Sequence, residues 1–481
     1  MGGLGALLAL LAPAAAGAMF IKGWLPGRGA GLWALSVGVG YPLGLLAAAA
    51  LLGVQGRVFG SLAPWLLLGG WLAAAVVLGV RLERRGDLAL GELPWAEARV
   101  PQAWRSPSVW LPAAILTLLG LRLVSLAIEQ WSLGLFAWDA FSTWSYRARV
   151  WVEAGQWVPF VFPEAWLADR ESGARALGAA HYPTLISLVS AWPALAAGRW
   201  HESLANLPWL GLFVALGAGV YGFSRRWGLG VVPALIGPWA LLSLPLVGGQ
   251  IALAGYADIW LATVLGFAFA AALIAQRDGD RRFLLLSVAL ALTGVFIKAE
   301  GLVWLAFFIP MAIVYRWGLK GWIAIGGLAV AVVGLLAVTG GLNFSVPGLG
   351  AVSLSLDRVA TARTGVFEFV SQEGVLTPLL VHLLVFGSWH LLVPVLALAI
   401  AGSVGSLARE DSGLLAERWQ QGAFVWVLSA IAAFYLLFFW TPAAEWVRLG
   451  TSVNRIMLHF APALVFWLMT LWHSIERRSA S

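Results

Sequence analysis

Long apolar runs, separated by short polar connections, follow one another along the whole chain. The hydrocarbon core of a bilayer is about 30 Å thick, so a helix of about 20 apolar residues can cross it. Because lipid offers no partner for backbone N–H and C=O groups, such segments are expected to be helical. The fourteen apolar segments lie at 3–21, 31–53, 60–80, 108–128, 182–198, 206–223, 229–247, 257–275, 283–297, 301–315, 321–341, 375–404, 422–440 and 456–472.

Basic connections predict the orientation of these segments. Lys and Arg concentrate in the connections 81–107 and 276–282, around Arg316, and at the C-terminus. Cytoplasmic loops of membrane proteins carry an excess of these residues. We therefore place the four connections in the cytoplasm. The long connections 129–181 and 342–374, together with 441–455, are then external.

The number of crossings must be odd, because this scheme puts the N-terminus outside and the C-terminus inside. Fourteen segments are one too many. The excess lies between residues 181 and 258, where three segments join two external positions. One of the three is expected to be a half-membrane or interfacial piece. We predict an all-α polytopic membrane protein with about 13 transmembrane helices.

The N-terminal segment 3–21 resembles a signal peptide, since "APAAAGA" is similar to a cleavage site. It lacks a positively charged start, however, and its apolar run is long. We interpret it as a retained helix. Residues 1–107 then form an N-terminal three-helix segment with a basic cytoplasmic loop. Residues 108–475 form the main membrane module.

Composition agrees with a polytopic membrane protein and excludes several kinds of chemistry. Hydrophobic residues make up 61% and charged residues 11%, against about 25% charged in soluble domains. The net charge of +7 is explained by cytoplasmic loops that face anionic lipid, so we expect no nucleic-acid partner. There are no cysteines, which excludes disulfides, thiolate metal sites and a cysteine nucleophile.

The first large external connection begins with an aromatic stretch, and candidate chemistry starts there. We expect its tryptophans, with neighbouring apolar residues, to form one face of a helix in the membrane interface. These tryptophans are Trp131, Trp138, Trp144, Trp151 and Trp157. Asp139 follows a transmembrane segment directly, in a partly apolar setting that suits a general base. Arg147 is either a solvated charge or a substrate contact.

Two further helix starts carry polar side chains on the predicted external side. "HYP" places His181 and Tyr182 just before Pro183, which suits the first turn of a helix. His181 is either a plain interfacial histidine or part of a binding site. "YAD" places Asp258 at the start of an apolar helix. That aspartate either serves the helix dipole or faces a functional cavity.

The turn "IKAEG" places Lys298 and Glu300 between two short apolar segments. Each segment is too short for a comfortable crossing, so the turn is expected to be external and sunken. The two residues form either a simple ion pair or a cationic pocket in which Glu300 orients the lysine toward a phosphate. Arg455 begins the last segment on the external side, where it either snorkels or joins this pocket.

In order and topology these motifs resemble the bacterial GT-C-fold glycosyltransferases, which include relatives of the protein O-mannosyltransferases and aminoarabinose transferases. The stretch "WDAFSTWSYRARVWVEAG" is most similar to uncharacterised bacterial members. The resemblance covers roughly residues 110–470. The three additional N-terminal helices depart from many relatives.

The resemblance implies an inverting transfer of a sugar from a polyprenyl-phosphate-linked donor to a hydroxyl of a glycan, lipid or protein acceptor. It implies a bacterial inner-membrane location with the active site facing the periplasm. Asp139 would be the general base and Asp258 the second acidic residue of the site. Lys298 and Arg455 would offset the lipid phosphate. We expect no cofactor and do not favour a divalent cation, although Asp139 and Asp258 offer oxygen ligands.

Two other classes of function compete with a transferase. A secondary transporter or lipid flippase also uses broken helices and intramembrane charges, but the sequence shows no internal repeat. The other alternative is an assembly factor whose charges are only membrane anchors.

Overall fold

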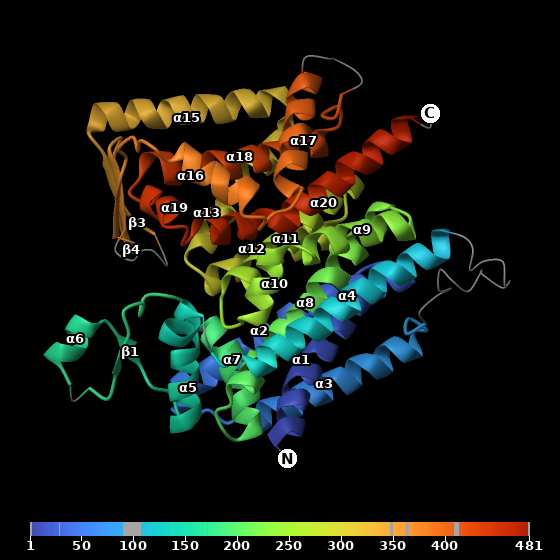
Figure 1. Cartoon of the computed structure of the whole chain (residues 1–481), viewed down its shortest axis with the longest axis vertical. Helices are drawn as coiled ribbons and strands as arrows, with labels where there is room; N and C mark the ends of the chain where they lie inside the picture. The colour runs from blue at the N-terminus through green and yellow to red at the C-terminus, as the bar shows by residue number, and fades with distance from the viewer. Residues whose placement is uncertain are drawn as a thin grey trace. The chain divides into compact units, whose positions relative to one another are not determined.

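The computed structural model of the chain describes residues 2–27, 29–89, 107–135, 137–170, 172–346, 350–361, 365–407 and 413–479. Residues 90–106, most of the predicted basic loop 81–107, lie outside this set. The chain divides into two compact units (Figure 1). The first contains residues 1–302 and 461–473, and the second contains 303–460 and 474–481. The first unit thus continues past the boundary that we placed at residue 107.

The first unit is helical apart from two short parallel strands. Its elements are α1 (Gly2–Trp24), α2 (Ala30–Phe59), α3 (Pro64–Arg84), α4 (Pro107–Ser132), η2 (Ala140–Trp144), α5 (Ser145–Ala154), β1 (Phe160–Val161), α6 (Pro163–Ala168), β2 (Arg175–Ala176), α7 (Leu185–Ala197), α8 (Glu202–Trp227), α9 (Val231–Leu242), α10 (Pro245–Ala252), α11 (Asp258–Asp278) and α12 (Arg281–Ile297). The middle of α20 (Val453–Ser479) also belongs to it.

Glycines allow three of these helices to approach closely, as small residues do in membrane bundles. A methyl group added at Gly17 of α1 would lie 2.2 Å from the carbonyl oxygen of Gly40 in α2. One added at Gly38 of α2 would lie 2.2 Å from the backbone nitrogen of Gly219 in α8. The first two helices therefore pack into the same bundle as α8 rather than forming a separate module.

The helix α7 does not cross the bundle. Thr184, just before it, accepts a hydrogen bond from Arg57 at the end of α2 (3.0 Å). At its other end, a methyl group on Gly2 at the start of α1 would meet the carbonyl oxygen of Ala197 at 3.0 Å. The end of α2 and the start of α1 lie at the same end of this hairpin. These contacts are consistent with α7 as the half-membrane piece expected between residues 181 and 258, which stays a prediction.

The bend between α9 and α10 divides the predicted segment 229–247. The two helices meet at 64°. Pro245 begins α10, and Leu244 before it has extended backbone angles (φ −58°, ψ 126°), because a residue that precedes proline is disfavoured in the α region.

One end of the first unit is rich in basic residues, and we call it the basic end. Arg282 donates to the carbonyl oxygen of Trp24 (2.9 Å), Arg226 pairs with Asp278 (2.8 Å), and Arg277 donates to the carbonyl oxygen of Trp227 (2.5 Å). These contacts join the end of α1 to the start of α12, and the end of α8 to the end of α11. The basic residues gathered there are Lys22, Arg225, Arg226, Arg277, Arg281 and Arg282.

The second unit combines helices with an antiparallel sheet. Its elements are α14 (Phe308–Trp317), α15 (Leu319–Thr339), β3 (Leu342–Val346), β4 (Gly350–Leu354), β5 (Arg358–Thr361), β6 (Gly365–Glu368), α16 (Leu376–Leu380), η3 (Val381–Val385), α17 (Leu392–Leu407), α18 (Arg418–Trp440), α19 (Ala444–Arg448) and the first part of α20. Short α13 (Glu300–Ala306) spans the boundary between the units.

Two features of the second unit differ from the sequence prediction. The strands β3–β4–β5–β6 form a sheet in that order within the predicted external connection 342–374, so the chain is not helical throughout. The predicted segment 375–404 is broken between η3 and α17. Gly387 (φ 71°) and His390 (φ 47°) adopt left-handed backbone conformations there, which a continuous helix does not accommodate.

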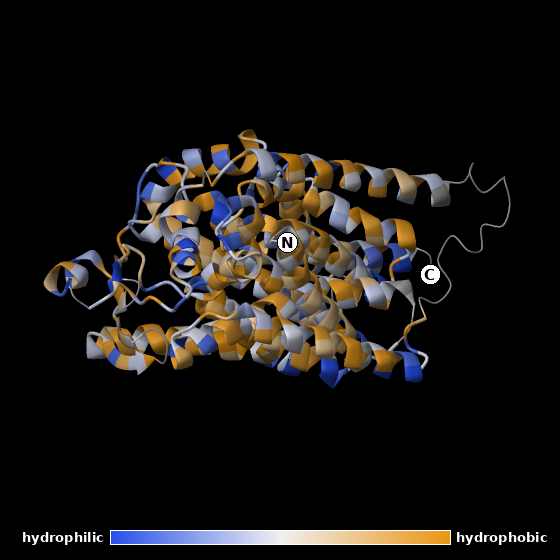
Figure 2. Ribbon diagram, turned by 90° about the horizontal axis from the view of Figure 1, so that it is seen from below, coloured by the Kyte–Doolittle hydropathy of each residue, from blue (hydrophilic) through white to orange (hydrophobic). Residues whose placement is uncertain are grey.

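The described residues confirm a multi-pass helical membrane protein. Ten of their helices are long and apolar enough to cross a bilayer, or up to eleven if the bent pair α9–α10 is one span. Figure 2 shows hydrophobic colour along the helices and hydrophilic colour mainly at their ends and connections. The count of about 13 stays a prediction, because α12 has 17 residues and α17 has 16.

Candidate functional site

Three charged side chains meet at the end of the first unit opposite the basic end. Lys298 Nζ lies 2.9 Å from Asp258 Oδ1 and 2.9 Å from Glu300 Oε1. We call Asp258, Lys298 and Glu300 the ion triad. The side chain of Asp258 is 0% exposed, that of Lys298 6%, and that of Glu300 30%. The ion pair expected in "IKAEG" therefore exists and extends to a buried aspartate, while the cationic pocket for a phosphate stays a prediction.

The hairpin of α11 and α12 places the triad. Gly279 (φ 70°) ends α11, and the Asp280 side chain accepts a hydrogen bond from the backbone N–H of Arg282 to cap α12, which is a usual way to begin a helix. The hairpin turn therefore lies at the basic end. Asp258 at the start of α11 and Lys298 at the end of α12 consequently meet at the opposite end.

Gly301 lets the chain turn tightly after Lys298. Its N–H donates to the carbonyl oxygen of Lys298 (3.0 Å). A methyl group at this position would lie 2.2 Å from the carbonyl oxygen of Gly294 in α12. The close approach of this turn to α12 fixes the position of Glu300 relative to Lys298.

We expect Gly301→Ala to destabilise the protein by about 1–3 kcal/mol, because overpacking at a rigid backbone contact forces the turn to shift. Thermal unfolding in detergent measures the loss. Gly120→Ala in α4 is the matched control, since a methyl group there meets nothing within 4 Å. Equal stability of the two variants would contradict this account of the turn.

Asp139 lies on a segment that packs against the loop leading to Asp258. It is half-buried and immediately precedes η2. A methyl group added at Gly255 would lie 2.6 Å from Cβ of Ala140 and 3.1 Å from Oγ of Ser145. Gly255 is three residues before Asp258. The structure thus brings the two predicted carboxylates onto neighbouring segments.

The loop before Asp258 has an unusual backbone. Ala254 (φ 34°) and Gly255 (φ 79°) are consecutive residues with positive φ, and Ala254 is fully buried. Positive φ in a residue with a side chain is costly, and such strain is often found at functional sites. The Trp209 indole donates to the carbonyl oxygen of Tyr256 (3.0 Å) and helps to hold the loop. The sequence motif "YAD" did not reveal this strain.

Aromatic rings connect the Asp139 segment to the "HYP" loop. Trp144 of η2 contacts the Tyr182 ring (centroids 5.3 Å apart), and Tyr182 stacks on His181 (4.6 Å). His181 also stacks on Phe162 (5.7 Å), which is exposed and was missed in the sequence. The rings of Trp144, Tyr182, His181 and Phe162 thus form a row that ends at an exposed side chain.

Arg147 holds the "HYP" loop through hydrogen bonds to its backbone. Its guanidinium donates to the carbonyl oxygens of Ala179, Ala180, Tyr182 and Pro183 at 2.9–3.3 Å. The residue is 1% exposed, and burial lowers the pKa of Arg147 to about 10, which leaves it charged at neutral pH. These contacts support a positioning role rather than the predicted substrate contact.

We expect Arg147→Lys to loosen this loop, because a lysine ammonium has three donors and lacks the planar fork that reaches all four carbonyls. Hydrogen exchange across residues 177–184 is expected to accelerate at least about tenfold, corresponding to roughly 1.4 kcal/mol. Arg149→Lys serves as the control, since Arg149 makes an exposed pair with Glu153. Unchanged protection in the Arg147 variant would exclude the positioning role.

The predicted single tryptophan face does not exist. Trp144 (2% exposed) and Trp151 (0%) point into the protein, whereas Trp138 is 71% exposed and Trp131 58%. The π-helical turn η2 lies between the two groups. Such a turn inserts an additional residue into the helical repeat, so the face that begins with Trp138 does not continue to Trp144.

Asp258 and Arg455 are the remaining site residues that the sequence predicted. Because Asp258 is fully buried and bonded to Lys298, its contacts support a positioning role, while the predicted catalytic role stays a prediction. Arg455 lies in the first turn of α20 and belongs to the second unit, so its convergence with the triad also stays a prediction. Among the described residues, no group of three or more His, Cys, Asp or Glu is arranged to hold a metal ion.

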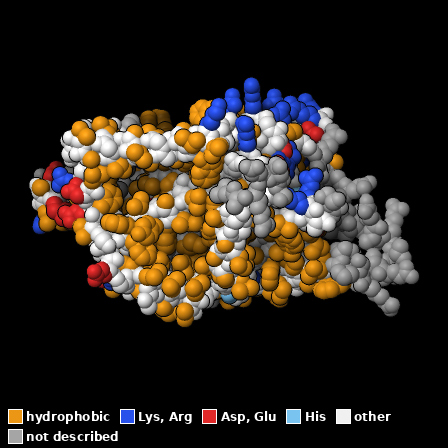
Figure 3. Space-filling view, turned by 90° about the horizontal axis from the view of Figure 1, so that it is seen from above, with side chains coloured by type: hydrophobic (Ala, Val, Ile, Leu, Met, Phe, Trp, Pro, Cys, Tyr) orange, Lys and Arg blue, Asp and Glu red, His pale blue; other side chains and the backbone are white. Residues whose placement is uncertain are grey.

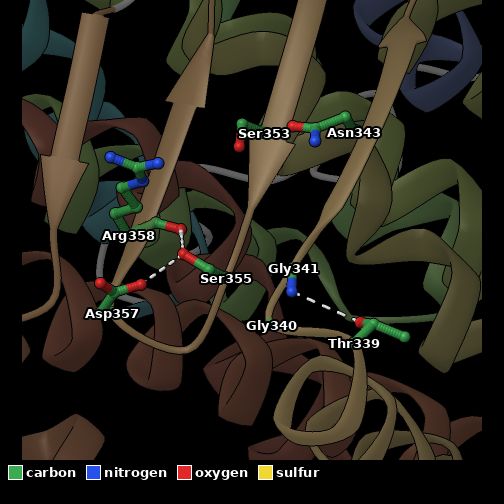
Figure 4. A pocket seen from close by; sticks show the side chains of 8 residues that line it. All are labelled: Thr339, Gly340, Gly341, Asn343, Ser353, Ser355, Asp357 and Arg358. Atoms are coloured by element: carbon green, nitrogen blue, oxygen red, sulfur yellow. Dashed lines mark hydrogen bonds between the residues drawn. The ribbon is translucent and has the colours of Figure 1, made fainter.

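A polar pocket of about 280 Å³ lies on the sheet of the second unit and was not predicted (Figure 4). Asn343 and Ser353 face each other across β3 and β4, and Asp357 and Arg358 lie nearby. The hydrogen bond from Ser355 lowers the pKa of the Asp357 carboxyl. Both charged side chains that line the pocket, Asp357 and Arg358, are exposed. The pocket therefore does not resemble a catalytic centre.

Comparison of the chain with protein-family models, with curated proteins and with solved structures finds no match.

Proposed function

We propose that this protein is a membrane glycosyltransferase with a GT-C-like fold. It moves a sugar from a polyprenyl-phosphate-linked donor to an acceptor hydroxyl, with inversion at the anomeric carbon. The observation that carries the proposal is the packing of the Asp139 segment against the strained loop that leads into the ion triad. The half-buried carboxylate of Asp139 and the buried ammonium of Lys298 thereby lie on neighbouring segments at one end of the bundle.

This pairing suits displacement at an anomeric carbon. A carboxylate on one face takes the proton of the acceptor hydroxyl, and a cation on the other offsets the charge of the departing phosphate. Asp139 is assigned the first task and Lys298 the second, with Arg455 as a further cation. Asp258 holds Lys298 in place. The row of Phe162, His181 and Tyr182 offers rings on which the sugar or acceptor can pack.

Charge asymmetry supports an external active site. The basic end of the first unit fits the cytoplasmic side by the positive-inside tendency, which supports our proposal that the ion triad lies outside, in a bacterial inner membrane facing the periplasm. Figure 3 shows that Lys and Arg side chains on the face it draws gather toward one end. Thirteen crossings are consistent with this orientation.

A transfer assay tests the proposal. The purified protein is supplied with polyprenyl-phosphate sugars in lipid nanodiscs, and release of polyprenyl phosphate is followed with glycan, lipid and protein acceptors. We expect release that depends on an acceptor. No release with any donor, from protein that is demonstrably folded, would count against the enzyme class.

One observation favours a transporter as the second candidate. The 64° break between α9 and α10 resembles the discontinuous helices that bind substrates in transporters. Uptake measurements in proteoliposomes distinguish the two functions. Asp139→Asn would leave uptake unaffected if the protein were a transporter that uses only the buried Asp258–Lys298 pair.

A further inference from the structure

The ammonium of Lys298 is already engaged by two carboxylates. Both carboxylate contacts are 2.9 Å long, and the three groups together carry a formal charge of −1. A phosphate that approached Lys298 would therefore meet a lysine whose charge is shared between two anions. For a phosphate oxygen to gain a strong charge-assisted contact, one of these carboxylates must move away.

The surroundings of the two carboxylates decide which one can move. Asp258 is fully buried at the start of a helix that is itself buried, and breaking a buried ion pair is strongly unfavourable. The Glu300 side chain is 30% exposed and lies at the start of the seven-residue helix α13. Separating Glu300 from Lys298 therefore places less charge in the protein interior than separating Asp258 would.

We propose that Glu300 is the exchangeable partner of Lys298, and that the phosphate of the lipid-linked donor takes its place. The identity of this ligand rests on the proposed glycosyltransferase function. After transfer, polyprenyl phosphate remains on Lys298 with more negative charge than the donor diester had. Glu300 then returns to the lysine and promotes release of this product. Glu300 is thus a competitor of the phosphate, rather than a residue that orients the lysine toward it.

Phosphate affinity tests this exchange. The Glu300→Gln variant keeps the shape of the side chain but removes its charge. Its affinity for polyprenyl phosphate in phosphatidylcholine nanodiscs is expected to rise about tenfold, because a competing anion next to the binding cation is lost. Steady-state sugar transfer is expected to fall, because the product leaves more slowly. Glu153→Gln, which removes an equal charge from an exposed pair with Arg149, is expected to leave the affinity unchanged.

Two further measurements identify the chemistry of the ligand and allow a conclusion even if the Glu300→Gln variant does not fold. A parallel titration with inorganic phosphate shows whether the site recognises the phosphate alone; tightening with either ligand supports the exchange. Equal or weaker affinity of folded Glu300→Gln for both ligands overturns it. If that variant does not fold, a structure of the wild-type protein with polyprenyl phosphate decides, since the Glu300–Lys298 contact of 2.9 Å must then be broken. Because the affinity and structural measurements do not involve sugar transfer, they remain decisive if the transferase assay fails.

Discussion

The Asp139→Asn variant is expected to lose sugar transfer while it keeps its fold. A general base accelerates such steps by about 10²–10⁴-fold, and asparagine cannot accept the proton of the acceptor hydroxyl. Asp139 is half-buried at the start of η2, so the exchange of one oxygen for an amide nitrogen disturbs little packing. The initial rate of polyprenyl phosphate release, at saturating donor, measures the effect.

The Asp169→Asn variant is the matched control for this measurement. Asp169 belongs to the same connection between α4 and α7 but is exposed after α6. Its loss is expected to leave the rate unchanged within about twofold, as for surface substitutions away from a site. Wild-type turnover by Asp139→Asn would falsify the assignment of the base.

The second large effect concerns stability. Lys298→Met is expected to destabilise the protein by about 3–5 kcal/mol, because it leaves the buried carboxylate of Asp258 without its cation. Unfolding of the detergent-solubilised protein by heat or denaturant measures the change. Weaker donor binding is also expected, by about 1–3 kcal/mol for a lost charge-assisted contact, but it can be assessed only in protein that stays folded.

A double-mutant cycle separates the ion pair from the packing of its two side chains. Combining Lys298→Met with Asp258→Asn removes both charges, so much of the lost stability is expected to return. For comparison, Arg149→Met breaks an exposed pair and is expected to change stability by less than about 1 kcal/mol. If the double variant were as unstable as Lys298→Met alone, the buried ion pair would not explain the loss.

The sequence predicted those features that depend on residues close to one another in the chain. The apolar runs on either side of "IKAEG" became α12 and the pair α13–α14, with Lys298 in the turn between them and Glu300 as the first residue of α13. The requirement for an odd number of crossings predicted one half-membrane piece, and the contact of Arg57 with Thr184 is consistent with α7 in that role. Hydropathy and charge counting suffice for such features, because each depends on residues that are close in the chain.

The features that depend on distant contacts could not be predicted in this way. Nothing in "YAD" indicates that Asp258 bonds Lys298 forty residues later, or that Gly255 rests on Ala140. The π-helical turn that separates Trp138 from Trp144 breaks the regular spacing on which the tryptophan face was based. The four-stranded sheet was missed because its strands are short and lie within a connection that we treated only as external.

Asp139 and Lys298 are proposed to act on the same lipid-linked sugar phosphate, Asp139 as the base at the anomeric carbon and Lys298 as the cation that binds the phosphate. A structure of the protein with a bound, non-hydrolysable polyprenyl-phosphate sugar tests it most directly. The account predicts a phosphate oxygen within hydrogen-bond distance of Lys298 Nζ and the anomeric carbon turned toward the carboxylate of Asp139. A ligand bound elsewhere, with the ion triad unchanged and Asp139 directed away from the sugar, would contradict the account.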